Sequence, residues 1–172
     1  GLDAGLARQR HFPAINWLNS YSLYPQSLDQ WFRDNIAQDF PEIRTQISGL
    51  LQIEAELQEI VQLVGSDALP VDQQLTLEVA RMIREFFLQQ NGFDPVDAYC
   101  DIKLQYEMAK AILSFQDAAK TAMADGALLN DVVNVPARSN LMRGRFEDGY
   151  LERIEAMVKE MNEQIANAVE AN

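Results

Sequence analysis

A chain of 172 residues is long enough for one domain with a sizeable hydrophobic core. Apolar residues make up 48% of the chain and charged residues 23%, which is typical of a globular protein and excludes a disordered one. The formal net charge of −12, from 14 Lys and Arg against 26 Asp and Glu, argues against binding to nucleic acid or to anionic lipid, because both require clustered positive charge.

The first part of the chain predicts an extended segment followed by helices. Residues 4–24 are broken by proline and mixed in composition, so we expect an extended arm there. Ser27, with Gln30 three residues later, forms a capping-box pattern that predicts a short helix. Pro41 suits the first turn of a longer helix, and Gly65 is placed to end it. Apolar residues recur along that helix at helical spacing: Ile43, Ile47, Leu50, Leu51, Leu57, Ile60, Val61 and Val64.

Long helices are also predicted in the middle of the chain. Residues 66–70 form a tight turn, and a second long helix follows until Asn91 and Gly92 stop it. Another helical stretch is predicted to begin at residues 94–97 and to lead into a long helix that Gly126 ends.

The last part of the chain is less regular before it becomes helical again. Residues 127–149 contain Pro136, Gly144 and Gly149, which predicts one or two short helices. From Tyr150 onward an amphipathic stripe predicts a final helix: Leu151, Ile154, Val158, Met161, Ile165 and Val169. The sequence therefore predicts an all-α fold, in which residues 1–24 form an extended arm and residues 25–172 form a helical bundle.

No group of residues in the sequence resembles catalytic equipment. There is no Gly-rich phosphate loop, no Cys/His cluster and no nucleophile–base pair. Cys100 and His11 are single, so we expect a small buried hydrophobic residue and a structural hydrogen-bonding residue. Glu54, Glu56 and Glu59 lack the Glu-x-x-His partners of bundle metal sites, so we predict a solvated helix face and no metal site.

Two aromatic strings stand out. Phe12 precedes Pro13, which favours an extended backbone, and Phe93 follows Gly92 just past a predicted helix end. Both rings suit presentation at a domain edge, where flat apolar surfaces can stack on a base. The residues alone leave open the alternative that both are ordinary core rings.

The sequence motifs around these rings, and others in the chain, resemble those of a known family. Arg10–Leu18 (RHFPAINWL), Leu77–Arg81 (LEVAR), Phe87–Asn91 (FLQQN) and Gln105–Met108 (QYEM) are similar to the C-terminal helical domain of the catalytic A subunit of archaeal/vacuolar-type rotary ATPases. The similarity spans most of residues 2–115, and the remainder matches loosely. The related beta subunit of F-type enzymes has Tyr-Pro-Ala-Val in place of the Phe-Pro-Ala-Ile string. By this resemblance the chain is a fragment of a larger multidomain subunit, with its arm joining the nucleotide-binding domain.

The resemblance implies a role in nucleotide binding. It implies that Phe12 packs on the adenine, that Phe93 closes the other side, that Phe87 is a further wall and that Gln90 contacts the base edge. The phosphate loop, magnesium ligands and water-activating carboxylate belong to the upstream domain in that family. ATP or ADP with Mg is therefore expected in the intact subunit, and none tightly bound to this fragment, which is not by itself an enzyme.

The turn between the two long helices is the second implied site. In the F-type relative an acidic segment at this place pushes on the rotating central stalk. Here only Asp67 and Asp72 are acidic, which favours a steric push through Leu69, Pro70 and Val71, with Leu69 and Val71 expected to be exposed. A plain helix–helix turn is the alternative.

The resemblance also implies partners and a location. The expected partners are the central-stalk subunit of a proton- or sodium-translocating motor, together with its B subunit. No apolar run reaches the about 18 residues of a membrane helix, and no signal peptide pattern opens the chain, so we expect a cytoplasmic, peripheral part of a membrane-attached complex. Two alternatives remain open: a free-standing helical interaction adaptor, or the equivalent domain of the non-catalytic B subunit.

Overall fold

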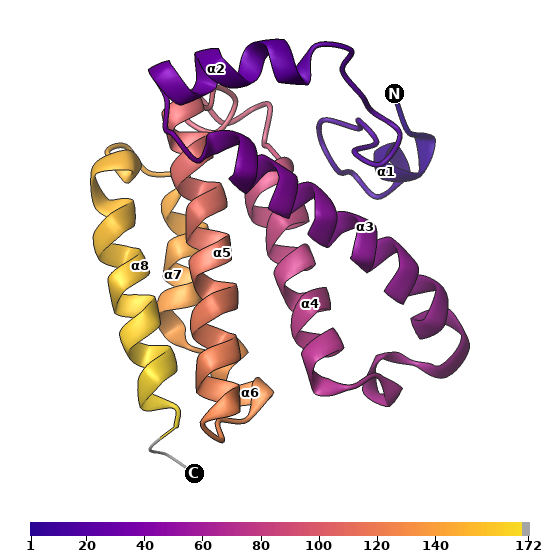
Figure 1. Ribbon diagram of the computed structural model, residues 1–172, viewed down its shortest axis with the longest axis vertical. Coiled ribbons are helices and arrows are strands. Elements are labelled where there is room, and N and C mark those ends of the chain that lie inside the picture. Colours follow the sequence, from indigo (N-terminus) through magenta and orange to yellow (C-terminus); the bar gives the residue numbers. More distant parts are fainter. Residues whose placement is uncertain (170–172) are drawn as a thin grey trace.

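The computed structural model describes residues 1–169, and this part of the chain is predominantly helical (Figure 1). It contains no β-strand within those residues, only an isolated antiparallel bridge between Leu2 and Ile15. The all-α prediction is therefore confirmed. The elements in chain order are α1 (Ala4–Arg8), α2 (Pro25–Asn35), α3 (Phe40–Val64), the 3-10 turn η1 (Ser66–Ala68), α4 (Val71–Met82), the π-helix η2 (Ile83–Leu88), α5 (Ile102–Ala124), α6 (Leu129–Val133), α7 (Pro136–Gly144) and α8 (Tyr150–Asn167).

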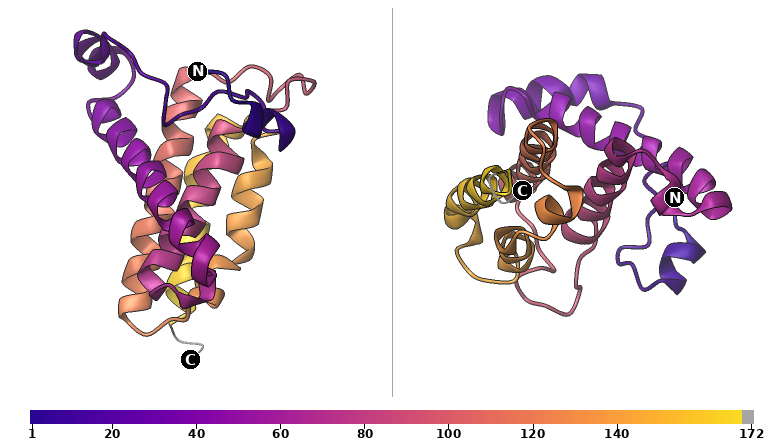
Figure 2. Two further views of the ribbon diagram at one scale, coloured as in Figure 1. Left: turned by 90° about the vertical axis from the view of Figure 1, so that its right-hand side faces the viewer. Right: turned by 90° about the horizontal axis from the view of Figure 1, so that it is seen from below.

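The helices form a bundle from which a hairpin projects. α5 packs against α4 and α8, and α7 packs on α8 (Figures 1 and 2). α3 and α4 run antiparallel and meet at η1, which is the tip of the hairpin, while α2 lies against the start of α3. The N-terminal arm with α1 lies near the opposite end of the hairpin, where η2 continues α4 (Figure 1).

The hydrophobic core lies between α4, α5, α7 and α8, where the predicted apolar stripes meet. Burying one large apolar side chain contributes about 1.5–3 kcal/mol, so this core supplies most of the stability. Its largest fully buried side chains are Phe86, Phe115, Leu75, Met82, Ile83, Ile112, Leu141, Ile154, Met161 and Ile165. Leu151 and Val158 of the predicted α8 stripe are less deeply buried, because they lie toward the edge of the helix that faces solvent.

Three predictions of local secondary structure are wrong. α2 begins at Pro25 instead of Ser27, so Ser27 lies inside the helix and its hydroxyl donates to the carbonyl of Tyr24 rather than capping. Residues 94–97 form turns, because the Asp94 carboxylate accepts from the amides of Val96 and Asp97 and so closes the backbone locally. Part of the arm is α-helical, since the Asp3 carboxylate caps α1 at its N-terminus.

The solvated helix face predicted for the three glutamates is wrong at Glu54. Glu56 and Glu59 are exposed, whereas Glu54 is buried and its carboxylate accepts from Arg84 Nε at 2.9 Å. Arg84 lies in η2, so this ion pair joins the two sides of the hairpin, α3 and the continuation of α4, near the base of the hairpin. A periodic pattern of glutamates cannot reveal that one of them has a cationic partner 30 residues away.

Arg138 forms a second buried ionic contact. Its guanidinium donates to the Glu78 carboxylate and the Val133 carbonyl, and it lies 4.9 Å from the Phe115 ring centroid. Burial lowers the pKa of Arg138, and the neighbouring Glu78 opposes that shift. The contact fixes α7 against α4 and α5.

Gly144 allows the end of α7 to pack closely on α8. A Cβ at Gly144 would lie 2.6 Å from Tyr150 Cε2, and that ring is buried with its hydroxyl donating to the Leu141 carbonyl. We expect Gly144→Ala to lower the free energy of unfolding by about 1–3 kcal/mol, the usual effect of overpacking. Urea unfolding followed by circular dichroism measures this change.

Gly49→Ala is the matched control. Gly49 is also helical, but beyond the adjacent helix backbone no atom lies within 4 Å of a Cβ built on it, so alanine should raise stability by up to about 1 kcal/mol. Equal stability of the two variants would contradict the tight packing at Gly144.

Candidate functional site

A pocket of about 540 Å³ lies where the N-terminal arm meets the segment that follows η2. Two of the predicted rings, Phe12 and Phe93, line it together with Gln90. Its remaining lining residues are Arg10, Gln89, Asn91, Gly92, Arg145 and Phe146. Three of the four residues predicted for nucleotide contact, from distant positions in the sequence, therefore share one pocket.

The Phe12 ring rests against backbone. A Cβ at Gly92 would lie 3.1 Å from Phe12 Cε1, so the absence of a side chain at position 92 is what lets the ring approach. The backbone amide of Gln90 donates to the Phe12 carbonyl at 2.6 Å, and this hydrogen bond joins the N-terminal arm to the segment that follows η2. Phe12 is 55% exposed and Phe93 is fully exposed, so the alternative that both are core rings is wrong.

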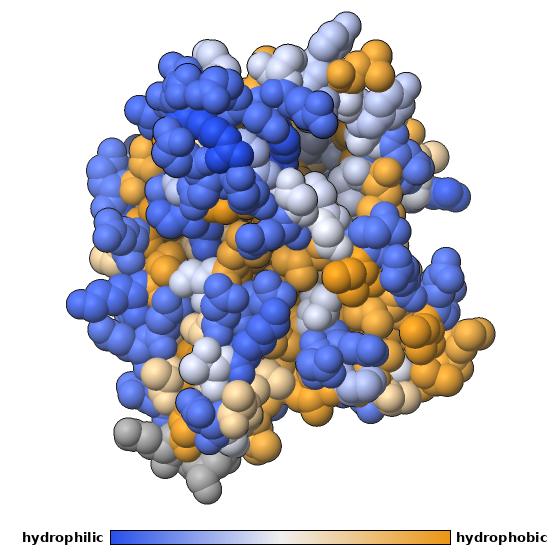
Figure 3. Space-filling view, viewed as in Figure 1, coloured by the Kyte–Doolittle hydropathy of each residue, from blue (hydrophilic) through white to orange (hydrophobic). Residues whose placement is uncertain are grey.

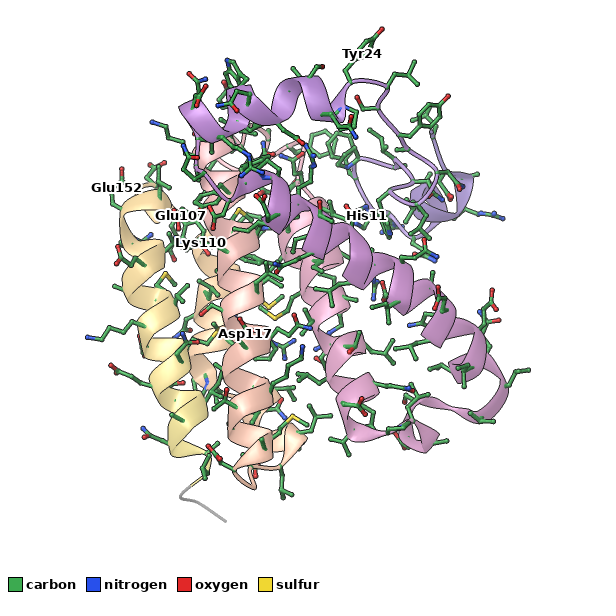
Figure 4. All side chains as sticks on the ribbon, viewed as in Figure 1. His11, Tyr24, Glu107, Lys110, Asp117 and Glu152 are labelled. Atoms are coloured by element: carbon green, nitrogen blue, oxygen red, sulfur yellow. The ribbon has the colours of Figure 1, made fainter. Side chains whose placement is uncertain are left out.

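His11 anchors the arm beside the pocket. It is buried, and its Nε2 donates to the Arg84 carbonyl at 3.1 Å. Its ring centroid lies 5.4 Å from that of Trp17. These contacts agree with the structural role predicted for His11. Because His11 immediately precedes Phe12, its hydrogen bond to Arg84 fixes the start of the Phe12 backbone to the hairpin (Figure 4).

Arg145 lies behind the pocket and holds its walls. Its Nη1 lies within 3.1 Å of three carbonyl oxygens at the end of η2, those of Glu85, Phe86 and Gln89. Its Nε is 3.6 Å from Asp97 Oδ1, while Asp97 Oδ2 accepts from the Asn91 amide at 2.6 Å. Burial lowers the pKa of Arg145, and the carboxylate of Asp97 opposes that shift.

Sequence reasoning missed Arg145 and Phe146. They lie at the end of α7 in the segment predicted as least regular, with no local pattern that points to a site. The Phe146 ring stacks on the guanidinium, with its centroid 4.6 Å from Arg145 Cζ. Only the fold brings this pair to the pocket.

Phe87 is not brought into the pocket with the other three residues. It lies in η2 and faces a separate cavity of about 180 Å³, with Cys100 and Met108. Gln90 borders both spaces and donates through Nε2 to the Asp97 carbonyl. Cys100 is half-buried instead of fully buried, and burial raises the pKa of its thiol to about 11.

The hairpin tip differs from its prediction at one position. Asp67, Pro70, Val71 and Asp72 are exposed as the turn pattern suggests, but Leu69 is only 6% exposed. The exposure predicted for Leu69 is wrong, because its side chain turns inward where η1 joins α4. The apolar surface of the tip instead includes the end of α3.

We name this surface the tip patch: Leu63, Val64 and Val71. Apolar surface is visible at this end of the hairpin in Figure 3, at the lower right. An exposed apolar cluster at the end of a two-helix projection is typical of a contact surface.

The described part of the chain holds no candidate metal centre. Across residues 1–169, no three His, Cys, Asp or Glu side chains are grouped so that they could hold a metal ion. In the same range, none of the helices has the length and apolar character needed to cross a membrane.

Comparison with known proteins agrees with the resemblance. The family model described as the C-terminal domain of V and A type ATP synthase matches residues 29–133. The chain is 50% identical over 166 residues to the A subunit of the A-type ATP synthase of Methanosarcina barkeri, covering 96% of this chain and 29% of that protein. It is 51% identical over 161 residues to the corresponding protein of Methanoregula boonei, covering 94% and 27%, respectively.

A third relative gives the same result. The corresponding A subunit of Natronomonas pharaonis is 50% identical over 164 residues, which is 95% of this chain and 28% of that protein. The chain thus spans less than a third of the length of these relatives. Together with the helical fold, these matches show that the chain belongs to the family of C-terminal domains of V- and A-type ATP synthases.

Proposed function

We propose that this chain is the C-terminal helical domain of the catalytic A subunit of a rotary ATP synthase. In this proposal it supplies the adenine side of the ATP site and couples nucleotide state to rotation of the central stalk. The observation that carries the proposal is the convergence of Phe12, Phe93 and Gln90 on one pocket that opens to solvent. Residues 1–24 join the domain to the nucleotide-binding domain upstream.

The chemistry of the pocket suits a base. Its rings offer flat apolar surfaces, and stacking on one aromatic side chain contributes about 1–3 kcal/mol per base. Gln89, Gln90 and Asn91 add amide groups that can donate to and accept from the polar edge of a base. The phosphates and Mg are held by the upstream domain, which also supplies the chemistry of hydrolysis and synthesis.

The coupling follows from the connection between pocket and tip. The segment that lines the pocket, residues 89–93, begins where η2 ends, and η2 continues α4, one of the two helices of the hairpin. The Glu54–Arg84 pair and the His11–Arg84 hydrogen bond fix the arm and α3 to the same point. Closure of the pocket on a nucleotide therefore moves the hairpin as a rigid unit, and the tip patch moves against the stalk.

The rings provide the direct test of the base contact. In the whole subunit, Phe12→Ala and Phe93→Ala should each weaken ATP binding by about 1–3 kcal/mol, because each removes a stacked surface. The two effects should be non-additive, since both rings face one base. Calorimetric titration of ATP measures them.

Phe115→Ala is the control for loss of a ring. Phe115 is fully buried in the core, so its removal should lower stability by about 3–5 kcal/mol without a base-specific effect. Unchanged ATP affinity in a folded Phe12→Ala subunit would exclude the adenine role.

Gly92 gives a subtler test of the same pocket. In Gly92→Ala the new Cβ meets the Phe12 ring at 3.1 Å, so the exposed ring must shift and its stacking geometry is lost. We expect ATP affinity to fall by about 1 kcal/mol, the lower end of a stacking contribution, with little change in stability. Gly49→Ala, in open space on α3, should leave affinity unchanged. If both variants bind ATP like the parent, the close approach has no role in binding.

The tip patch provides the test of coupling. Replacing Leu63, Val64 and Val71 with Ser should lower torque while ATP affinity stays near normal, because an apolar contact is lost far from the pocket. Replacing Asp67 and Asp72 with Asn should matter less, since exposed charge pairs contribute about 0–1 kcal/mol. Single-molecule rotation of the assembled complex compares the two. Torque lost only in the Asp variants would replace the steric account with an electrostatic one.

A further inference from the structure

We infer that Phe146 is a third aromatic wall of the nucleotide pocket, and that Arg145 is the positioning residue that holds it there. This inference rests on the proposed function and adds residues that neither the sequence pattern nor the family match assigns. It extends the base contact to the end of α7, a part of the chain beyond the segment that the family model matches.

Packing and backbone hydrogen bonds at the end of α7 place Phe146 at the pocket. Gly144 packs directly on the buried Tyr150 ring, which fixes the end of α7. The Phe146 amide donates to the Arg143 carbonyl, and the Glu147 amide donates to the Gly144 carbonyl, so a turn follows at once. Phe146 nevertheless remains 40% exposed, although Arg145 beside it is buried.

This arrangement is the reverse of what solvation alone would favour. An arginine is usually exposed and a phenylalanine usually buried. Here the guanidinium is committed to the η2 carbonyls and Asp97, and the ring covers it while facing the pocket shared with Phe12 and Phe93. A ring held in this way loses little conformational entropy when it contacts a ligand.

The chemistry of the wall selects a flat, uncharged ligand group. The guanidinium beneath Phe146 is already engaged by Asp97 and by backbone carbonyls, and the apolar face of the ring offers no donor to a phosphate. A purine has two fused rings, so an additional wall adds more contact to a purine than to a pyrimidine. Phe146 should therefore raise the preference of the site for ATP over CTP.

The experiment tests three ligands on the whole subunit: ATP, CTP and ribose 5-triphosphate, which lacks a base. Phe146→Leu should weaken ATP binding about fivefold or more, the lower end of one stacked ring, and reduce the ratio of ATP to CTP affinity. Binding of ribose 5-triphosphate should be unchanged. Phe146→Trp should restore ATP affinity, and Tyr99→Leu, which removes an exposed ring outside the pocket, should have no effect.

Arg145→Lys tests the positioning role, since lysine keeps the charge but lacks the planar fork that reaches the carbonyls and stacks on the ring. It should lower the ATP-to-CTP ratio as Phe146→Leu does. A variant that loses thermal stability yet keeps the parent ratio would overturn the positioning role.

The outcomes separate this inference from the proposed function. If Phe12→Ala weakens ATP binding and Phe146→Leu does not, the third wall is wrong and the base pocket stands. If neither does, the base pocket itself is wrong. An equal loss for ATP and for ribose 5-triphosphate in Phe146→Leu would show a structural effect and overturn the contact with the base.

Discussion

The open carbonyl groups at the end of η2 are the constraint on which the pocket depends. A π-helix bonds residue i to residue i+5, as the Gln89 amide does with the Arg84 carbonyl, and its last carbonyls lack intrahelical donors. Each buried carbonyl left unpaired costs about 1–3 kcal/mol. Arg145 supplies the missing donors from a distant helix, and it thereby fixes where the following segment leaves the bundle.

One continuous helical segment, α4 followed by η2, therefore connects the tip of the hairpin with the pocket. α4 starts at the tip, η2 ends at the pocket, and Arg84 between them binds both Glu54 of α3 and His11 of the arm. The proposed coupling draws on the bonds at this junction: the backbone amides of Gln89 and Gln90 donate to the carbonyls of Arg84 and Phe12, and Arg145 contacts the Gln89 carbonyl. Packed cores and bonded junctions move as units rather than deforming continuously.

The long helices could be predicted from the sequence because their evidence is local. Neighbouring residues alone define the apolar stripes of α3, α5 and α8. The same holds for the helix ends at Gly65 and Gly126. The burial of Glu54 depends on Arg84, 30 residues along the chain, and that of Leu69 depends on how the backbone turns between η1 and α4, so the sequence pattern assigned both to the surface. Phe12, Phe93 and Gln90 could be found through the resemblance of their strings, whereas the loosely matching tail gave no reason to select Arg145 or Phe146.

The charge of the domain supports the proposal that it serves only one side of a nucleotide. Several of the 14 basic side chains, among them Arg84, Arg138 and Arg145, are bound to carboxylates at sites buried or partly buried in the fold. Of the two cations that line the pocket, Arg145 is buried against carbonyls and Arg10 alone is exposed. A triphosphate needs several exposed donors and a metal, and an acidic surface repels it. The aromatic walls remain available for the uncharged base, so electrostatics supports the proposed division of the site between this domain and one upstream.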